Sequence, residues 1–65
     1  MITSNVKKLM SGRKMTIRGL VAESGLSDKT ILRARSEHIV ECRLRTLQTI
    51  AKFLDCKVKE LFDET

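Results

Sequence analysis

The segment TIRGLVAESGLSDKTILRAR, residues 16–35, decides how this chain folds. Gly25 divides it into two stretches that each suit a short helix. Glycine adopts the left-handed conformation that ends a helix without steric cost, so the chain can turn sharply at this position. The segment therefore predicts one helix over residues 17–24, a turn at Gly25 and Leu26, and a second helix over residues 28–36.

Hydroxyl side chains mark the start of both expected helices. Thr16 precedes the first helix and Ser27 precedes the second. The oxygen of such a residue accepts a hydrogen bond from a backbone N–H group of the first turn, which caps the helix. Two short helices joined by a tight turn form the helix-turn-helix motif, whose second helix enters the major groove of DNA.

The second helix of this motif presents a polar face. At 100° per residue, one face of about 140° is formed by Asp28, Lys29, Leu32, Arg33 and Ser36. Ile31 and Ala34 lie opposite this face, so we expect them to be buried. A face that mixes charged and hydroxyl side chains with one leucine suits DNA base edges better than a protein core.

Positive charge is concentrated in the half of the chain that holds this motif. Residues 1–35 carry eight Lys and Arg against two acidic residues, whereas residues 36–65 carry five against six. A basic half alone is compatible with a solvated surface. Because this half also contains the helix-turn-helix pattern, it indicates a nucleic-acid partner.

Three further helices are expected on either side of the motif. One covers residues 4–11, with Ser4 as its cap and Gly12 as the left-handed residue that ends it. Another covers residues 43–54, and its apolar residues recur at helical spacing: Leu44, Leu47, Ile50, Ala51 and Leu54. The last covers residues 58–62. The sequence thus predicts a single all-α domain of five helices that spans all 65 residues.

The connection over residues 37–42 contains two apolar residues, Ile39 and Val40, in an otherwise polar stretch. One or both of them pack beneath the loop, or they form a contact with a partner. Cys42 lies at the end of this loop, where an exposed thiol is an option, whereas Cys56 lies between apolar residues and is expected in the core.

Several function classes lack the residues that they need. With His38 as its only histidine and two distant cysteines, the chain offers neither a metal site nor a nucleophile–base pair. We therefore expect no enzyme activity, no metal, no cofactor and no small-molecule ligand. The stacking aromatics of single-strand RNA readers are also missing. Neither a membrane span nor a secretion signal is present, so we expect a cytoplasmic location at the nucleoid.

The chain resembles the Cro/repressor helix-turn-helix family, also called XRE-like, over nearly its whole length. The resemblance is carried by KMT at residues 14–16, Leu20, GLS at 25–27, TI at 30–31, LRTLQTIAKFL at 44–54 and KELF at 59–62. In length and in its opening residues the chain is most similar to small lambdoid-phage Cro proteins and to repressor DNA-binding domains. The resemblance implies a compact lambda-repressor-like domain of phage or prophage origin.

The resemblance also implies roles for individual residues. The expected base contacts are Asp28, Lys29, Thr30 and Arg33. The expected phosphate contacts are Thr16, Ser27, Lys8 and Arg43. Family geometry places the expected dimer surface at Leu54, Lys57, Val58 and Phe62. Asp28 has two readings: its carboxylate accepts from a cytosine amine, or it only stabilises the positive N-terminal end of its helix.

Some positions depart from the family pattern. Ile17 replaces a common phosphate-binding Gln, and Glu37 replaces a common Gly. Arg35 stands where many members have Glu, and Met10 stands where the Arg partner of that Glu would be. Both ends of an expected ion pair have changed together, which leaves Arg35 free to reach DNA or another carboxylate.

Two functions remain open at the level of sequence. The first is a sequence-specific double-stranded DNA regulator, a repressor that binds a palindromic operator as a homodimer. Its half-sites would lie about 34 Å apart on one face of the duplex. The second is a protein–protein module, such as an anti-repressor or an antitoxin-like subunit, that kept the fold and makes its contacts through Leu32 and the 37–42 loop. A steep salt dependence of DNA affinity distinguishes the first from the second.

Overall fold

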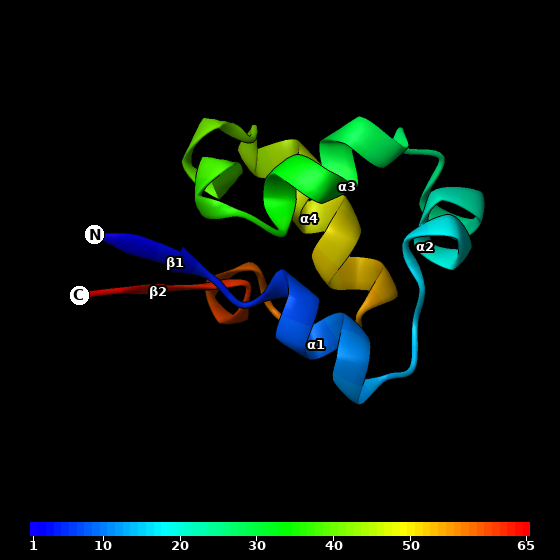
Figure 1. The fold of residues 1–65 in the computed structure, drawn as a ribbon, viewed down its shortest axis with the longest axis horizontal. Helices are drawn as coiled ribbons and strands as arrows, with labels where there is room; N and C mark the ends of the chain where they lie inside the picture. The colour runs from blue at the N-terminus through cyan, green and yellow to red at the C-terminus, as the bar shows by residue number, and fades with distance from the viewer.

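A computed structural model describes all residues, 1–65, as a helical bundle closed by a small sheet (Figure 1). In chain order the elements are β1 (Ile2–Ser4), α1 (Val6–Gly12), α2 (Ile17–Ser24), α3 (Asp28–Ala34), η1 (Glu37–Glu41), α4 (Leu44–Phe53), η2 (Val58–Glu60) and β2 (Phe62–Glu64), where η denotes a 3₁₀ helix. None of these helices combines the length and the hydropathy that crossing a lipid bilayer requires.

The two ends of the chain pair as an antiparallel sheet, which the sequence reading did not predict. Ile2 of β1 lies opposite Glu64 of β2, and Ser4 lies opposite Phe62. The prediction of five α-helices without strands is therefore wrong: the structure has four α-helices, and the segment expected as the fifth is a 3₁₀ turn followed by a strand. Figure 1 shows both termini at the same end of the molecule.

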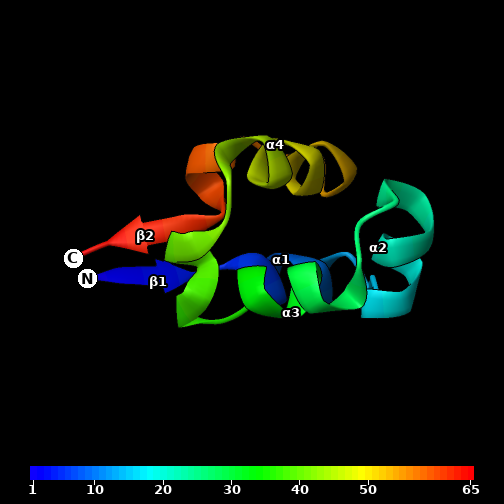
Figure 2. The ribbon, with the colours of Figure 1, turned by 90° about the horizontal axis from the view of Figure 1, so that it is seen from above.

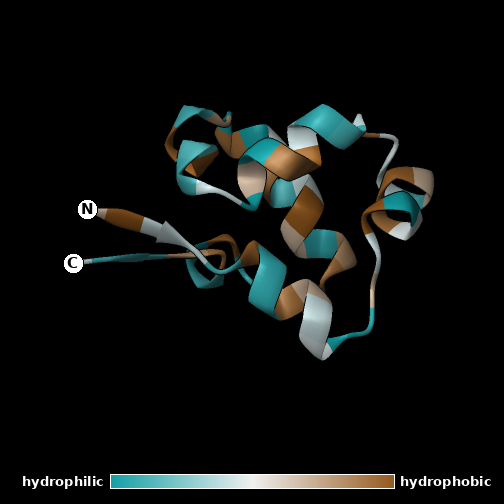
Figure 3. Ribbon diagram, in the orientation of Figure 1, coloured by the Kyte–Doolittle hydropathy of each residue, from teal (hydrophilic) through white to brown (hydrophobic).

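One hydrophobic core holds the helices together, and α4 crosses its centre. Seen from above, α4 forms one layer, α1 and α3 form the other, and α2 closes one end (Figure 2). The buried core residues are Val6, Met10, Leu20, Ile31, Ala34, Ile39, Leu47, Ile50, Ala51, Leu54 and Leu61. In Figure 3, apolar and polar segments alternate along the ribbon of each helix.

The amphipathic pattern of the fourth helix is confirmed with one exception. Leu47, Ile50 and Ala51 are buried as expected, whereas Leu44 is 64% exposed. Leu44 is the first residue of α4. Its exposed side chain lines an apolar pocket at this end of the helix.

The predicted turn of the helix-turn-helix motif is confirmed in detail. Gly25 is left-handed, with φ of 77°, and its N–H donates to the carbonyl of Val21 at 3.0 Å. The Thr16 hydroxyl accepts from the N–H of Gly19 at 3.0 Å, as an N-cap should. Leu26 is half-buried and packs against the core. The two helices are therefore fixed relative to each other by local hydrogen bonds as well as by packing.

The start of α1 differs from the prediction. The N-cap is Asn5, whose side chain makes no capping bond, and Ser4 belongs to β1. The Ser4 hydroxyl donates to the carbonyl of Ala34 and accepts from the N–H of Val6. Ser4 thus links the sheet to the end of α3 as well as to the start of α1.

Two helices end on left-handed residues that are not glycine. Gly12, expected as the left-handed end of the first helix, is the last residue of α1, and Gly25 is the only glycine with positive φ. Lys14 takes that role with φ of 55°, and Asp55 does the same after α4 with φ of 53°. At both ends the N–H of the following residue bonds to a carbonyl five residues back, which is a Schellman motif.

The loop over residues 37–42 is ordered as η1 and begins with its own cap. The Ser36 hydroxyl accepts from the N–H of His38 at 3.1 Å, so α3 ends two residues earlier than predicted. Ile39 is 2% exposed, whereas Val40 is 62% exposed. Packing beneath the loop is therefore confirmed for Ile39, and Val40 points away from the core.

Candidate nucleic-acid interface

The outer face of α3 carries two free cationic side chains. Lys29 and Arg33 are exposed, and neither forms an ion pair within the chain. Ile31 and Ala34, on the opposite face, are fully buried, as the helical spacing predicts. Leu32 lies on the outer face and is 51% exposed. Because the inner face is locked in the core, Lys29 and Arg33 are held on a rigid support with their donors directed to solvent.

The start of α3 is fixed by a hydroxyl pair. The Ser27 oxygen accepts from the Thr30 N–H at 3.2 Å, and the two hydroxyls lie 2.8 Å apart. Thr30 is half-buried, and its hydroxyl is engaged with Ser27. The cap therefore fixes the Thr30 side chain. Because its hydroxyl is engaged, its methyl group is the part that remains available for contacts.

Asp28 bonds to its own helix. One carboxylate oxygen accepts from the N–H of Lys29 at 2.8 Å, within the first turn of α3. This is the contact expected if the carboxylate stabilises the positive end of the helix. Asp28 is also exposed, and its second carboxylate oxygen accepts no hydrogen bond within the chain.

Beside the motif, α1 and α2 enclose a basic groove of about 500 Å³. Its lining residues come from both helices and from the end of α3: Lys7, Met10, Ser11, Met15, Thr16, Ile17, Arg18 and Arg35. No acidic residue lines it, and none of its three cationic side chains forms an ion pair. Three unneutralised cations around one groove suit an anion such as a backbone phosphate.

The sequence reading found this groove only in part. Met10 and Arg35, the two departures from the family pattern, both line it. Lys7 and Arg18 were missed. The available signal was the spacing of Lys7, Met10 and Ser11, which places them on one side of α1.

The four residues expected to contact phosphates lie in different places. Thr16 and Ser27 are exposed caps at the starts of α2 and α3. Lys8 is exposed on α1 but does not line the basic groove. Arg43 is exposed directly before α4 and forms no ion pair.

The residues expected at a dimer surface do not all reach the surface. Leu54 is fully buried in the core, so the expectation that it contacts a partner is wrong. Lys57 is exposed and Val58 half-buried where η2 begins, and Phe62 is half-buried in β2. The helical pattern placed Leu54 correctly on an apolar face, but that face is the one that packs inward.

Cys42 lies close enough to Arg33 for their charges to interact. Burial raises the pKa of the Cys42 thiol above its ordinary value, the Arg33 guanidinium opposes this shift, and the Glu41 carboxylate adds to it. Burial is also the main cause of the raised pKa of Cys56, which packs against the core. No group of three or more His, Cys, Asp or Glu residues is arranged to hold a metal ion.

Residues 5–64 match the family of Cro/C1-type HTH DNA-binding domains. The chain belongs to this Cro/C1-type family. The match covers both helices of the motif, the α4 helix behind them and β2 of the terminal sheet, but not β1. A search of curated proteins finds no match to the chain. Because the Cro/C1-type family is one of DNA-binding domains, the exposed face of α3 is the candidate DNA-binding surface.

Both motif helices of this Cro/C1-type chain carry a small apolar residue on their inner side. Val21 of α2 is half-buried against the core, and Ala34 of α3 is completely buried. Both residues therefore belong to the packing that joins the two motif helices to the core.

Proposed function

We propose that this protein is a sequence-specific regulator of transcription that places α3 in the major groove of double-stranded DNA. The observation that carries the proposal is the face of α3 that exposes Lys29 and Arg33 without partners while the opposite face is buried. A cation that no carboxylate neutralises keeps its full attraction for DNA, and a capped helix keeps it in place.

Base selection falls to the same helix. Lys29 and Arg33 donate to guanine O6 and N7, and each good contact contributes about 1–3 kcal/mol of discrimination. The Thr30 methyl suits contact with a thymine methyl, because the neighbouring hydroxyl is engaged with Ser27. Asp28 keeps one oxygen for the helix and has the other for a cytosine amine.

Phosphate contacts hold the domain in register on the duplex. Thr16, Ser27, Lys8 and Arg43 are exposed around the motif and are proposed for this role. To these we add the basic groove, whose cations are Lys7, Arg18 and Arg35. Arg35 replaces the Gln that is missing at Ile17, since both residues line the same groove.

A single α3 reads only a few base pairs, so we propose that two copies bind a palindromic operator as a homodimer. Their recognition helices then read half-sites about 34 Å apart, one turn of the duplex. The protein acts as a repressor, because occupation of a promoter by such a dimer excludes other proteins from the same DNA.

The test is selection of bound sites from a random duplex library, followed by affinity measurements on the selected site. Lys29→Ala and Arg33→Ala should each relax preference at particular base pairs, by about 1–3 kcal/mol. Lys8→Ala should weaken binding to all sequences alike and reduce the salt slope by about one. Lys52→Ala is the matched control, because Lys52 is exposed on α4, in the layer away from α3 (Figure 2).

Two results would contradict the proposal. One is a selection without a consensus, with affinities that none of the three substitutions changes. The other is an absence of binding to pooled DNA at low salt. The latter would favour the alternative of a protein–protein module, for which the exposed Leu32 and Val40 are the supporting observation.

A further inference from the structure

We propose that the apolar cleft between η1, the start of α4 and the terminal sheet is the surface through which two copies of this chain associate. This inference rests on the proposed homodimer and names its contact surface. It shares Phe62 with the dimer surface expected from family geometry and leaves out Leu54, which is buried in the core.

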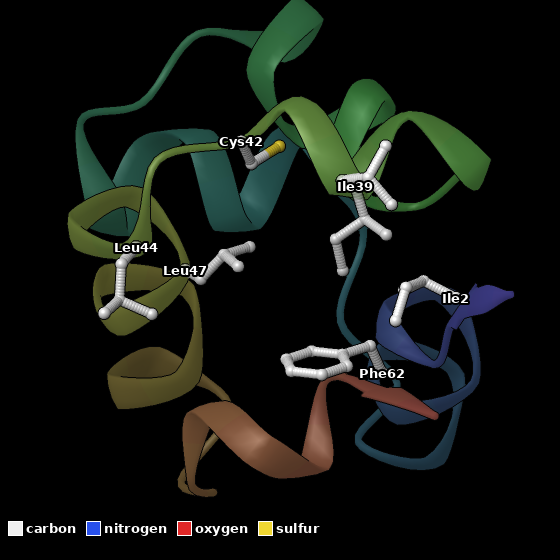
Figure 4. A pocket seen from close by; sticks show the side chains of 7 residues that line it. Ile2, Ile39, Cys42, Leu44, Leu47 and Phe62 are labelled. Atoms are coloured by element: carbon white, nitrogen blue, oxygen red, sulfur yellow. The ribbon is translucent and has the colours of Figure 1, made fainter. Parts of the chain in front are cut away.

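The cleft has a volume of about 300 Å³ and is lined only by apolar side chains and one cysteine. Its lining residues are Ile2, Ile39, Val40, Cys42, Leu44, Leu47 and Phe62. Figure 4 shows that side chains from both ends of the chain and from its middle surround one opening, with Phe62 and Ile39 on facing sides. Water solvates an apolar hollow of this kind poorly. Filling it with apolar side chains therefore lowers the free energy.

The rim of the cleft carries apolar side chains that could fill a second cleft. Val40 is 62% exposed and Leu44 is 64% exposed, and both are lining residues. Single exposed apolar residues are common, but two on the rim of one apolar hollow mark a candidate interaction site. The same patch supplies both the hollow and the side chains to fill it, which is what a two-fold contact between identical chains requires.

Charges near the rim are also compatible with self-association. Glu37 and Glu41 are exposed on η1, whereas Arg45 is exposed in the first turn of α4. Arg45 and Glu37 form no ion pair within the chain. When η1 of one copy faces α4 of the other, opposite charges meet twice across the two-fold axis.

The dimensions of the molecule are compatible with a contact at this end. The chain measures 31 × 21 × 16 Å along its principal axes. Figure 1 shows the terminal sheet and η1 at one end of the longest axis, α2 at the other end and α3 between them. Two copies that meet at the cleft end place their α3 helices about one molecular length apart, which approaches the turn of about 34 Å that separates half-sites.

The first test is the oligomeric state of the full chain without DNA, measured by sedimentation equilibrium. Val40→Asp and Leu44→Asp should each raise the dimer dissociation constant by at least about tenfold, since each places a charge in an apolar contact. Leu32→Asp is the matched control: Leu32 is also a half-exposed apolar residue, but it lies on α3 and not at the cleft. Circular dichroism should show the same helix content in all four proteins.

The second test uses the selected operator and a duplex that contains only half of it. Val40→Asp should keep the affinity for the half-site and lose the cooperativity on the full palindrome. A wild-type chain that binds no duplex at all contradicts the proposed function, whatever its oligomeric state. The cleft proposal is overturned if both cleft variants dimerise like the wild type, if Val58→Asp dissociates the dimer in their place, or if the wild type is monomeric both alone and on adjacent half-sites.

Discussion

The turn between α1 and α2 allows a sharp test, because sequence and structure place its left-handed residue differently. The sequence favours Gly12, whereas in the structure Gly12 is helical and Lys14 has φ of 55°. We predict that Gly12→Ala and Lys14→Gly both raise the free energy of unfolding. Together, the two substitutions transfer the glycine from position 12 to position 14, where φ is positive.

The expected gains follow from the local geometry. A Cβ on Gly12 meets no atom within 4 Å, so alanine there recovers the helix penalty of glycine, about 0.5–1 kcal/mol. A non-glycine residue in the left-handed region costs about 1–2 kcal/mol. Glycine at position 14 removes that cost but adds about 0.4–1 kcal/mol of unfolded-chain entropy. The double variant should therefore gain about 1–2 kcal/mol, with about 4–8 °C of Tm for each kcal/mol in a domain of this size.

Urea unfolding followed by far-ultraviolet circular dichroism measures both changes. Gly25→Ala is the control, because Gly25 has φ of 77° and alanine there should lose about 1–2 kcal/mol. If Gly12→Ala destabilised the protein as much as Gly25→Ala does, Gly12 would be left-handed. The end of α1 described above would then be wrong.

Three further predictions concern the core, the cap and the thiols. Leu61→Ala should cost about 2–5 kcal/mol in urea unfolding because Leu61 is fully buried; a loss below 1 kcal/mol would place this side chain at the surface. Ser27→Ala should cost about 1 kcal/mol and Ser27→Gly only a few tenths, since alanine leaves the Thr30 N–H without its acceptor; equal losses would speak against the cap. Because burial raises the pKa values of Cys42 and Cys56, the folded state favours their neutral thiols. Their contribution to stability should be complete below the ordinary thiol pKa of about 8.5 and should fall as the pH rises through the folded values. Replacing both cysteines by alanine should remove this alkaline loss, and a pH profile unchanged by that replacement would argue against it.

The helix-turn-helix segment was predictable because its determinants are local. Thr16, Gly25 and Ser27 each act on backbone groups within four residues, so their chemistry can be read from the order of residues alone. The inner face of α3 followed from helical spacing in the same way. Lys29 and Arg33 were placed on the outer face by the same argument, and the structure finds them exposed.

The terminal sheet was not predictable in this way. Its strands have three residues each, which is too short for a period of two to be recognised. The strand that contains Ile2 finds its partner at the other end of the sequence, where Phe62 follows a segment with helical spacing. Such long-range pairing leaves no signal in the neighbouring residues.

The basic groove could be predicted from the sequence only in part. Arg35 is recognisable in the sequence as a departure from the family pattern. The other two cations of the groove, Lys7 and Arg18, come from two other helices. Only the tertiary arrangement of α1, α2 and the end of α3 shows that the three cations surround one space. A groove of this kind depends on tertiary structure, and helical spacing alone shows only a part of it.

The pairing of β1 with β2 also makes the backbone almost a ring. The Met1 amino group donates to the carbonyl of Thr65 at 2.7 Å, and the Thr65 N–H donates back to Met1 at 2.9 Å. A linker of a few residues would close the chain without moving either strand. The positions of the chain ends are thus interchangeable in principle: a circularly permuted protein, opened at the exposed turn around Arg13, would keep every helix intact and leave the recognition helix untouched.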